Sequence, residues 1–559
     1  MAPESNYRLR FLKETSLQIF TGLLIPLFVG WLLHLGLWSM ALPVLFILLR
    51  STSNSYQRSK QASALSAKPI PCVRGKWPGN IDILLRIVQT GRTTYMRRNL
   101  ERFFDEYGCD ILNLRVLWKD TIITRDARHL RYSFLGNGIF NSDGDAWHKK
   151  RAVTRPFFVR DRISDMDIMD RQSEKFLQVL ADANTSYPAF DIQDLFLRFT
   201  MDVACEFLFG ITAGSLDSPL PIAGRATLGH KGSATDDDFG TFTQAFEAVQ
   251  VIQSARFLIG DSWPLFELFS DKSLGMVTTI QSWSRPNIER AIREAKDARE
   301  AGVPRNRAPT LLDHLIESIA EPDDVQFELL NVLMAARDTT GSVMAFVIYL
   351  LCLHPDVAQR LRSHVFDVWG KDGQPSYATI QKSEYMQAVL NETLRIFPPV
   401  AMGVRYSRSK PSSLPSDDPN RPFFMPGSTQ ITLLPTDIHR NKAFWGEDAD
   451  EFRPDRWLDP ALKQALATNP QMFIPFFQGP RICPGQQFAM AEATYLLARI
   501  LQKYRKFELC PEYQPAGSRP PSEWKQHNGR EAIEKCWPAS AFTLHIKGGL
   551  WVRATLDTA

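Results

Sequence analysis

Cys483 is the residue of this chain whose surroundings point most clearly to chemistry. The segment that contains it, residues 476–485, reads FFQGPRICPG. Gly479 and Gly485 permit tight turns that aim backbone N–H groups at the sulfur. A helix expected to begin near Gln486 places its positive end beside the same atom. Both effects lower the pKa of a thiol and favour the thiolate, which is the form that binds a metal ion.

Two side chains of the same loop support this interpretation. Arg481 can pair with an anionic group, and the ring of Phe476 can cover the sulfur. The alternative is an inert cysteine buried in a turn. The seven cysteines are odd in number, scattered and without a C-x-x-C pair, which argues against a disulfide framework or a zinc ribbon.

Asp338 and Thr339 lie within the longest apolar helical pattern of the body, Gln326–Leu353. An acid and a hydroxyl in such a helix are costly unless they are satisfied or used, so both are candidate functional residues. The alternative is a threonine that bonds back to the carbonyl at i−4 and bends the helix, beside a solvated aspartate.

Two pairs of residues have helical spacing. Glu392 and Arg395 share one helix face and can form an ion pair, although solvent-exposed pairs of this kind are common and contribute little. Trp147 and Arg151, at i and i+4, share one face of another helix. Without further information, the second pair is equally typical of an amphipathic surface helix.

Taken in order along residues 70–555, these motifs resemble those of the cytochrome P-450 monooxygenases. The cysteine loop matches the haem-binding loop of that family, F-x-x-G-x-R-x-C-x-G, at every defined position. The resemblance implies that haem b is the cofactor, with the Cys483 thiolate as the ligand of its iron. It also implies propionate contacts by Arg405, whose alternative role is an ordinary strand-surface charge. The implied cofactor-binding residues are Cys483, Arg481, Trp147, Arg151, Arg405, Phe476, Gly479 and Gly485.

Arg456 gains a role only through this resemblance. In the family, the E-x-x-R pair is joined by an arginine from a downstream loop, and Arg456 of the string FRPDRW matches it. Glu392, Arg395 and Arg456 are therefore expected to form a structural network that supports the haem side. Asp455 stands where glutamate is more usual, which is a small change.

The helix motif of the family, [A/G]-G-x-[D/E]-T, matches the residues that end in Asp338 and Thr339. The resemblance implies that Thr339 hydrogen-bonds the oxygen that is being activated and that Asp338 relays protons. Ala336 replaces the usual glycine, and its methyl group narrows the groove where oxygen binds. This departure puts the exact distortion of the helix in doubt, and the reaction class less so.

The elements that must position these residues are predominantly helical. Short, proline-broken runs predict strands in residues 400–437 and near the C-terminus. The expected fold is mainly α with a minor β part, and the resemblance implies the cytochrome P-450 fold, a helix-rich triangular prism around haem. Apolar residues at three-to-four spacing predict helices at 81–107, 162–183, 191–208, 242–259, 274–301, 326–353, 377–397 and 486–504.

Residues 15–49 contain no Asp, Glu, Lys or Arg, a run of 35 residues. A membrane span needs about 20 apolar residues, whereas the apolar core of a secretory signal has about 7–15. We expect a leader at 1–14, a transmembrane anchor at 15–49, a proline-containing linker at 50–80 and one haem-thiolate domain at 81–559. The anchor is either one span with an interfacial segment or two short helices that meet near residues 34–36.

Composition and charge exclude several classes of protein. Hydrophobic residues make up 44% and charged residues 23%, as in a folded globular chain, and the net charge of +4 does not indicate nucleic-acid binding.

Basic residues after the uncharged run place the body on the cytosolic side, and those before it weaken this assignment for a single span. Lys149, Lys150 and Arg155 form a basic cluster that the resemblance assigns to reductase docking and that is otherwise a solvated face.

The implied activity is oxidation of a hydrophobic small molecule with dioxygen and electrons that a reductase takes from NADPH. The implied location is the endoplasmic reticulum membrane, with the catalytic domain in the cytosol. Residues 138–140 through 155–158, and residues 336–340, resemble fungal enzymes related to alkane and fatty-acid hydroxylases. Expected substrates are a long-chain alkane or fatty acid, or a terpenoid or other secondary metabolite, with residues 241–260 and 537–545 lining the pocket.

Two other classes of function stay open. One is a haem-thiolate isomerase or dehydratase that needs no reductase, against which the intact Asp338–Thr339 pair argues. The other is a non-catalytic membrane carrier of lipid or haem, for which no NADPH-dependent turnover is expected.

Overall fold

The computed structural model describes most of the 559 residues. The segment 126–143, which includes part of the sequence resemblance noted above, lies outside the described residues. The described residues are 13, 16, 20–34, 36–93, 98–116, 119–125, 144–159, 166–229, 234–235, 241–259, 263, 266–267, 270–301, 310–319, 322–407, 409–418 and 420–557.

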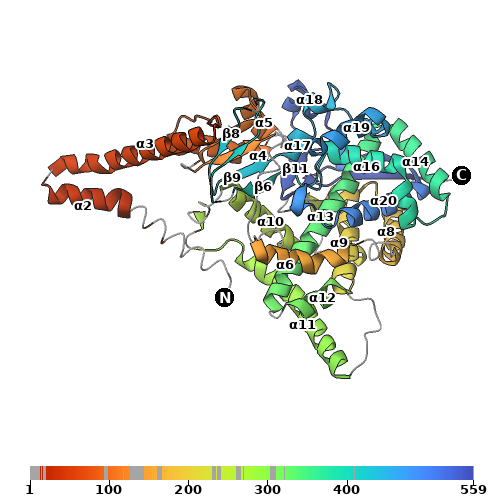
Figure 1. Cartoon of the computed structure of the whole chain (residues 1–559). Coiled ribbons are helices and arrows are strands. Elements are labelled where there is room, and N and C mark those ends of the chain that lie inside the picture. The colour runs from red at the N-terminus through yellow and green to blue at the C-terminus, as the bar shows by residue number, and fades with distance from the viewer. Residues whose placement is uncertain are drawn as a thin grey trace.

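Helices form most of the body, which confirms the mainly α fold class (Figure 1). The α-helices are α2 (Ile25–Leu32), α3 (Ala41–Ala64), α4 (Ile81–Thr93), α5 (Arg98–Tyr107), α6 (Gly144–Thr154), α8 (Asp167–Ser186), α9 (Ile192–Phe209), α10 (Thr241–Ile259), α11 (Leu274–Ala301), α12 (Leu311–Ser318), α13 (Pro322–Leu353), α14 (Pro355–Trp369), α15 (Tyr377–Lys382), α16 (Glu384–Ile396), α17 (Pro435–Ile438), α18 (Lys442–Trp445), α19 (Pro460–Thr468) and α20 (Gln486–Lys503).

The strands are short and form small sheets, as expected for the minor β part. A four-stranded sheet has the order β1-β2-β9-β6, in which β2 and β9 are parallel and the other pairs are antiparallel. A second sheet has the order β10-β13-β3, and β11 pairs with β12. The strands are β1 (Ile111–Asn113), β2 (Thr121–Thr124), β3 (Phe190–Asp191), β4 (Thr227–Leu228), β5 (Ala234–Thr235), β6 (Gly403–Tyr406), β7 (Ser412–Leu414), β8 (Phe423–Met425), β9 (Gln430–Leu433), β10 (Tyr504–Leu509), β11 (Pro538–Ala541), β12 (Thr543–Ile546) and β13 (Trp551–Leu556).

Helix α13 is the centre of the core. It packs against α9, α16, α20 and β12, and the residues 343–351 are almost fully buried. A helix that is apolar on all sides is stable only when it is buried in this way. Among helices of 18 or more residues in the described part of the chain, Asp324–Leu353 is the one apolar enough to cross a membrane, but 78% of its most apolar stretch is buried in the body. It is therefore a core helix.

Two expected elements differ from the structure. The predicted helix at 377–397 is divided into α15 and α16 at Ser383, whose backbone leaves the helical region and whose hydroxyl lies 2.9 Å from Nε2 of His364. The predicted linker at 50–80 is helical as far as Ala64, because α3 continues from the uncharged run without a break. Polar residues at 50–64 do not stop a helix when none of them is Pro or Gly.

Candidate functional site

The cysteine loop connects the end of the short helix η10 (Pro470–Met472) to α20. The Cys483 N–H donates to the Phe476 carbonyl at 3.0 Å, and the Ile482 N–H donates to the Gly479 carbonyl at 3.0 Å. Gly479 has φ +75°, a conformation that needs glycine. These bonds close the loop and place the sulfur beside the first turn of α20.

The protein around Cys483 acts on its thiol in two opposed ways. Burial raises its pKa most strongly, while the N–H groups of Gly485 and Gln486 and the charge of Arg151 lower it, and the net direction is upward. The expectation of a lowered pKa is therefore wrong for the thiol itself, because desolvation outweighs the helix end. Cys483 as a whole residue is nevertheless exposed. A coordinated metal ion would deprotonate it.

Three guanidinium groups lie in or beside this loop: that of Arg481 within it, and those of Arg151 on α6 and Arg405 on β6. Arg481 lies over the ring of Trp147 on α6 at 4.1 Å, and Arg405 on β6 lies over the ring of Phe477 at 5.0 Å. Arg151, one turn after Trp147, acts electrostatically on Cys483. Burial lowers the pKa of both Arg151 and Arg405, so a nearby anion would stabilise these partly desolvated cations. Arg405 is thus not an ordinary strand-surface charge.

This set of donors fits haem b. The sulfur could serve as the iron ligand, and the guanidinium groups of Arg481, Arg151 and Arg405 could pair with two carboxylates. Gly485 lies next to the sulfur, since a Cβ built on it would be 3.9 Å from that atom. Trp147 is 4% exposed, as expected of a residue that packs into the site. The sequence-predicted residues of the loop, α6 and β6 are therefore brought together.

Asp338 and Thr339 have different environments on α13. The Thr339 hydroxyl donates to the Ala335 carbonyl at 2.6 Å, so the local bond foreseen as an alternative is formed. Asp338 is not solvated. It is 2% exposed and pairs with Arg337 at 2.7 Å, which also reaches Glu247 on α10 at 3.3 Å.

Helix α13 approaches the cysteine loop through α20, against which it packs. Glu492 on α20 is fully buried, and neither of its carboxyl oxygens accepts a well-formed hydrogen bond from a described residue. Burial raises its pKa to about 8, and the Thr340 hydroxyl opposes this only in part. Sequence reasoning missed Glu492. The available signal was an acid within an otherwise apolar face of the helix that follows the cysteine.

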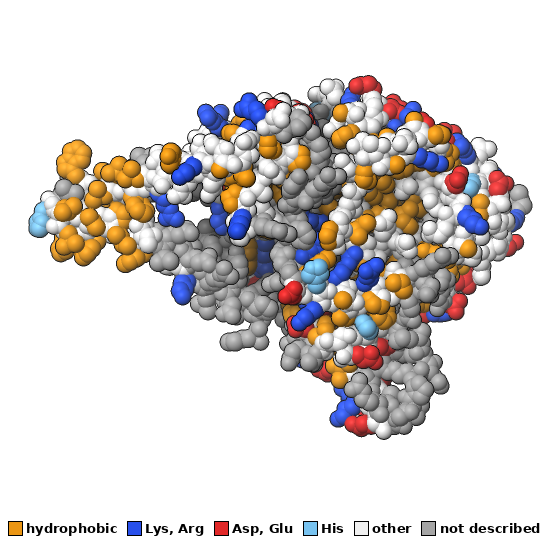
Figure 2. Space-filling view, in the orientation of Figure 1, with side chains coloured by type: hydrophobic (Ala, Val, Ile, Leu, Met, Phe, Trp, Pro, Cys, Tyr) orange, Lys and Arg blue, Asp and Glu red, His pale blue; other side chains and the backbone are white. Residues whose placement is uncertain are grey.

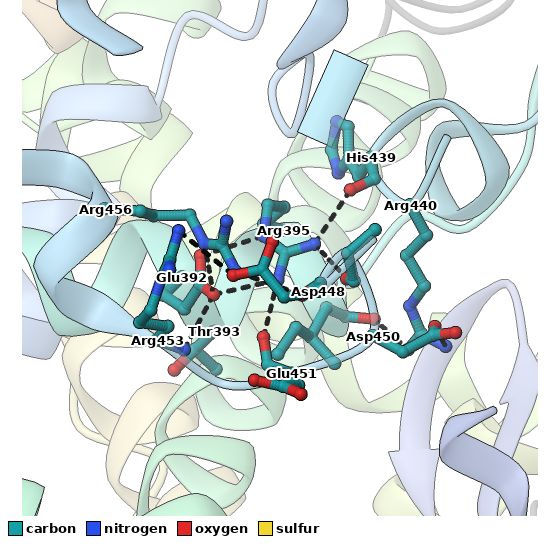
Figure 3. Close-up of polar contacts among 12 residues, drawn as sticks. Glu392, Thr393, Arg395, His439, Arg440, Asp448, Asp450, Glu451, Arg453 and Arg456 are labelled. Atoms are coloured by element: carbon teal, nitrogen blue, oxygen red, sulfur yellow. Dashed lines mark hydrogen bonds and ion pairs between the residues drawn. The ribbon is translucent and has the colours of Figure 1, made fainter. Parts of the chain in front are cut away.

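Glu392, Arg395 and Arg456 form the expected network, shown in Figure 3. Both Glu392 and Arg395 are fully buried, and Arg395 donates to Glu392 through Nε and Nη2 at 2.8 Å. The Arg456 Nε adds a third bond at 2.9 Å. Burial alone would raise the pKa of Glu392, but the two guanidinium groups and the Arg453 N–H outweigh it and lower the pKa.

Several partners in this network were not expected. The Trp457 Nε1–H and the Arg453 N–H each donate to Glu392 at 2.9 Å. Arg395 also donates to the carbonyls of His439 and Glu451, at 3.0 and 2.8 Å, and thereby ties α16 to the loop before η9 (Pro454–Leu458). The pair is thus structural and not a solvent-exposed helix pair.

The basic cluster on α6 divides into two parts. Lys149 and Arg155 are exposed, whereas Lys150 forms an ion pair with Glu328, a buried residue of α13. Lys150 therefore connects two helices of the body and is not a free surface charge.

Comparisons with known proteins identify the family of this chain. The cytochrome P-450 family model matches residues 110–526. A cytochrome P-450 monooxygenase, g430, of a Fusarium species is 28% identical over 503 residues, which cover 84% of this chain and 85% of the relative. Cytochrome P-450 52A3-A of Candida maltosa is 32% identical over 407 residues, with 70% and 73% covered. Cytochrome P-450 52A6 of Candida tropicalis is 29% identical over 519 residues, with 85% and 93% covered. The chain belongs to the cytochrome P-450 family, the haem-thiolate monooxygenases.

Proposed function

We propose that this monooxygenase oxidises a long-chain alkane or fatty acid, or a terpenoid or other secondary metabolite. Its electrons come from NADPH through a membrane-bound reductase that docks on the face carrying Lys149 and Arg155. The anchor at 15–49 holds the single domain at 81–559 to the endoplasmic reticulum membrane, on the cytosolic side. The observation that carries the reaction class is the cysteine loop, with the guanidinium group of Arg481 within it and those of Arg151 and Arg405 beside it.

The residues of the chain divide the work between binding and proton transfer. When bound, haem supplies the redox chemistry, and a thiolate ligand favours cleavage of the O–O bond. Cys483 would hold the iron, and Arg481, Trp147, Arg151 and Arg405 would orient the propionates. Asp338 and Thr339 occupy adjacent positions of α13 and would hold and pass protons. The apolar core around α13 excludes water from the reaction.

An apolar substrate is supported by the elements expected to line the pocket. Helix α10 packs against β11, which brings the expected segments 241–260 and 537–545 together. Phe242 and Phe246 on α10 are buried, and their rings lie 5.6 Å apart. The resemblance of the motifs to fungal alkane and fatty-acid hydroxylases favours a long alkyl chain within this group.

The test uses the full chain in membranes together with an NADPH-dependent reductase. The reduced carbon monoxide adduct should absorb at the position typical of thiolate-ligated haem, and Cys483→Ser should abolish this band. A mixed panel of fatty acids, alkanes and terpenoids, analysed by mass spectrometry, should give oxidised products that require both NADPH and reductase. A wild-type band without any such product would leave the isomerase alternative and contradict the proposal.

A further inference from the structure

The uncharged N-terminal run folds as a helical hairpin instead of one long helix. Its first arm is η1 (Phe20–Leu24) followed by α2, and its second arm is η2 (Gly36–Met40) followed by the start of α3. The two arms pack against each other and project from the body (Figure 1). The chain reverses at His34 and Gly36, which have φ +55° and +52°.

The side chains of this hairpin face outward. Trp31 is 70% exposed and Trp38 is 78% exposed, and Figure 2 shows apolar side chains gathered over both arms. A contiguous apolar surface of this size marks contact with a protein or a membrane. No acid, Lys or Arg interrupts it for 35 residues on any side, which fits lipid hydrocarbon. The other exposed apolar residues are Phe20, Leu23, Leu24, Ile25, Phe28, Val29, Leu32, Leu33, Met40, Val44, Leu45, Phe46 and Leu49.

We propose that this hairpin crosses the bilayer twice, with the turn at His34 on the far side and both ends of the run on the cytosolic side. The inference rests on the membrane attachment proposed above. Basic residues flank the run at both ends, and the cytosolic side is where such residues accumulate. A single span would put one basic flank on the wrong side, whereas a hairpin places both on the same side. These residues are Arg8, Arg10 and Lys13 before the run and Arg50, Arg58 and Lys60 after it.

The length of the second arm permits a crossing. From Gly36 to Leu49 the arm has 14 residues, which at the rise of 3₁₀- and α-helix give about 23 Å. The bilayer of the endoplasmic reticulum has a hydrocarbon core of about 27 Å. The remaining few ångströms are within the reach of the long side chain of Arg50, which follows the arm and is exposed.

A hairpin that ended inside the hydrocarbon is disfavoured by its turn. His34 at the turn is exposed, and a polar side chain in contact with lipid hydrocarbon is costly. A mismatch of a few ångströms costs only fractions of a kcal/mol per ångström. Trp31 and Trp38 flank the turn, and tryptophan is enriched where a membrane meets water.

The second arm is also connected rigidly to the body. Helix α3 continues past Arg50 to Ala64, where Ala62 is buried, and Arg58 pairs with Asp120 beside β2 at 2.8 Å. The hairpin therefore sets the face of the domain that lies on the membrane, as well as attaching it.

Three single-cysteine additions to the full chain test this topology: His34→Cys at the turn, Ser55→Cys on the polar half of α3, and Val44→Cys within the second arm. Sealed microsomes are treated with a membrane-impermeant maleimide, before and after a pore-forming peptide is added. Mass spectrometry of the labelled peptides separates the new cysteines from the native seven. An epitope tag fused to the N-terminus reports the position of that end.

We expect Ser55→Cys and the tag to react in sealed vesicles, His34→Cys to react only after pores are formed, and Val44→Cys to react in neither state. Labelling of His34→Cys in sealed vesicles would overturn the proposal. Protection of His34→Cys after pore formation would also overturn it, because the turn would then lie inside the hydrocarbon. A tag that is accessible only after pore formation would overturn it as well, because that result indicates a single span. Carbonate extraction and NADPH turnover of the same membranes test the attachment and the enzyme separately.

Discussion

Glu492 allows a quantitative test of how burial controls a charge beside the site. It is fully buried on α20, and burial raises its pKa from an ordinary 4.5 to about 8. At pH values between these two pKa values, Glu492 is protonated in the folded chain and ionised in the unfolded chain. The free energy of unfolding therefore falls by about 1.4 kcal/mol for each pH unit from about 4.5 to about 8, about 5 kcal/mol in total, and is constant above that.

Glu492→Gln removes the titration and keeps the shape and the polar contact with Thr340. Between about pH 6 and about pH 7.5, the wild type should lose about 2 kcal/mol more stability than the variant. Urea unfolding of the haem-loaded enzyme, followed by circular dichroism at both pH values, measures this difference. At the higher pH the variant should be the more stable protein.

An exposed glutamate provides the matched control. Glu523→Gln removes one acid in the same part of the chain, and its side chain is solvated in the folded enzyme. We expect this variant to show the pH dependence of the wild type. If Glu492→Gln and the wild type lose equal stability over the interval, Glu492 is ionised and satisfied in the fold, and the argument from burial is refuted.

Three further changes have defined outcomes. Glu392→Gln leaves two buried guanidinium groups without their counter-charge and should cost about 3–5 kcal/mol, measured by urea unfolding against Glu523→Gln. Gly403→Ala places a Cβ 2.3 Å from the ring of Phe477, so the cysteine loop must shift and the haem-to-protein absorbance ratio should fall. Gly275→Ala is the control, because its Cβ meets nothing within 4 Å, and it should leave the ratio unchanged. Thr339→Ala should increase the amount of NADPH consumed per product formed. Thr339→Ser keeps the hydroxyl and should show the wild-type ratio. Equal ratios in the wild type and both variants would show that Thr339 has no role in proton transfer.

The sequence was most informative where chemistry depends on neighbours along the chain. The loop around Cys483 is closed by bonds between residues at most seven positions apart, so its residue types could be interpreted directly. The helix at 274–301 has the predicted limits, although Pro286 lies inside it. The same reasoning overestimated the local electrostatics, because the thiol pKa depends on burial, which the segment itself does not reveal.

Long-range pairing was the main information that the sequence could not supply. The Lys150 ammonium was expected on a surface, yet its partner Glu328 lies 178 residues away. The carbonyls of His439 and Glu451, which accept from Arg395, lie 44 and 56 residues away and carry no side-chain signature, because they are backbone oxygens. The hairpin was one of two alternatives for 15–49, and what distinguishes it is the packing of two helical arms around the left-handed backbone at His34 and Gly36.

The polar groups along α13 show how an apolar core helix is held in one rotational position. Each contacts a different element, so a rotation of the helix would break several contacts at once. Replacing buried ion pairs by apolar residues often costs little stability, so such pairs can serve to specify one arrangement. For this enzyme that arrangement decides where the Thr339 hydroxyl lies relative to the cysteine loop. The contacts are Glu328 with Lys150 of α6, Arg337 with Glu247 of α10, Thr340 with Glu492 of α20, and Tyr349 with Glu534 before β11.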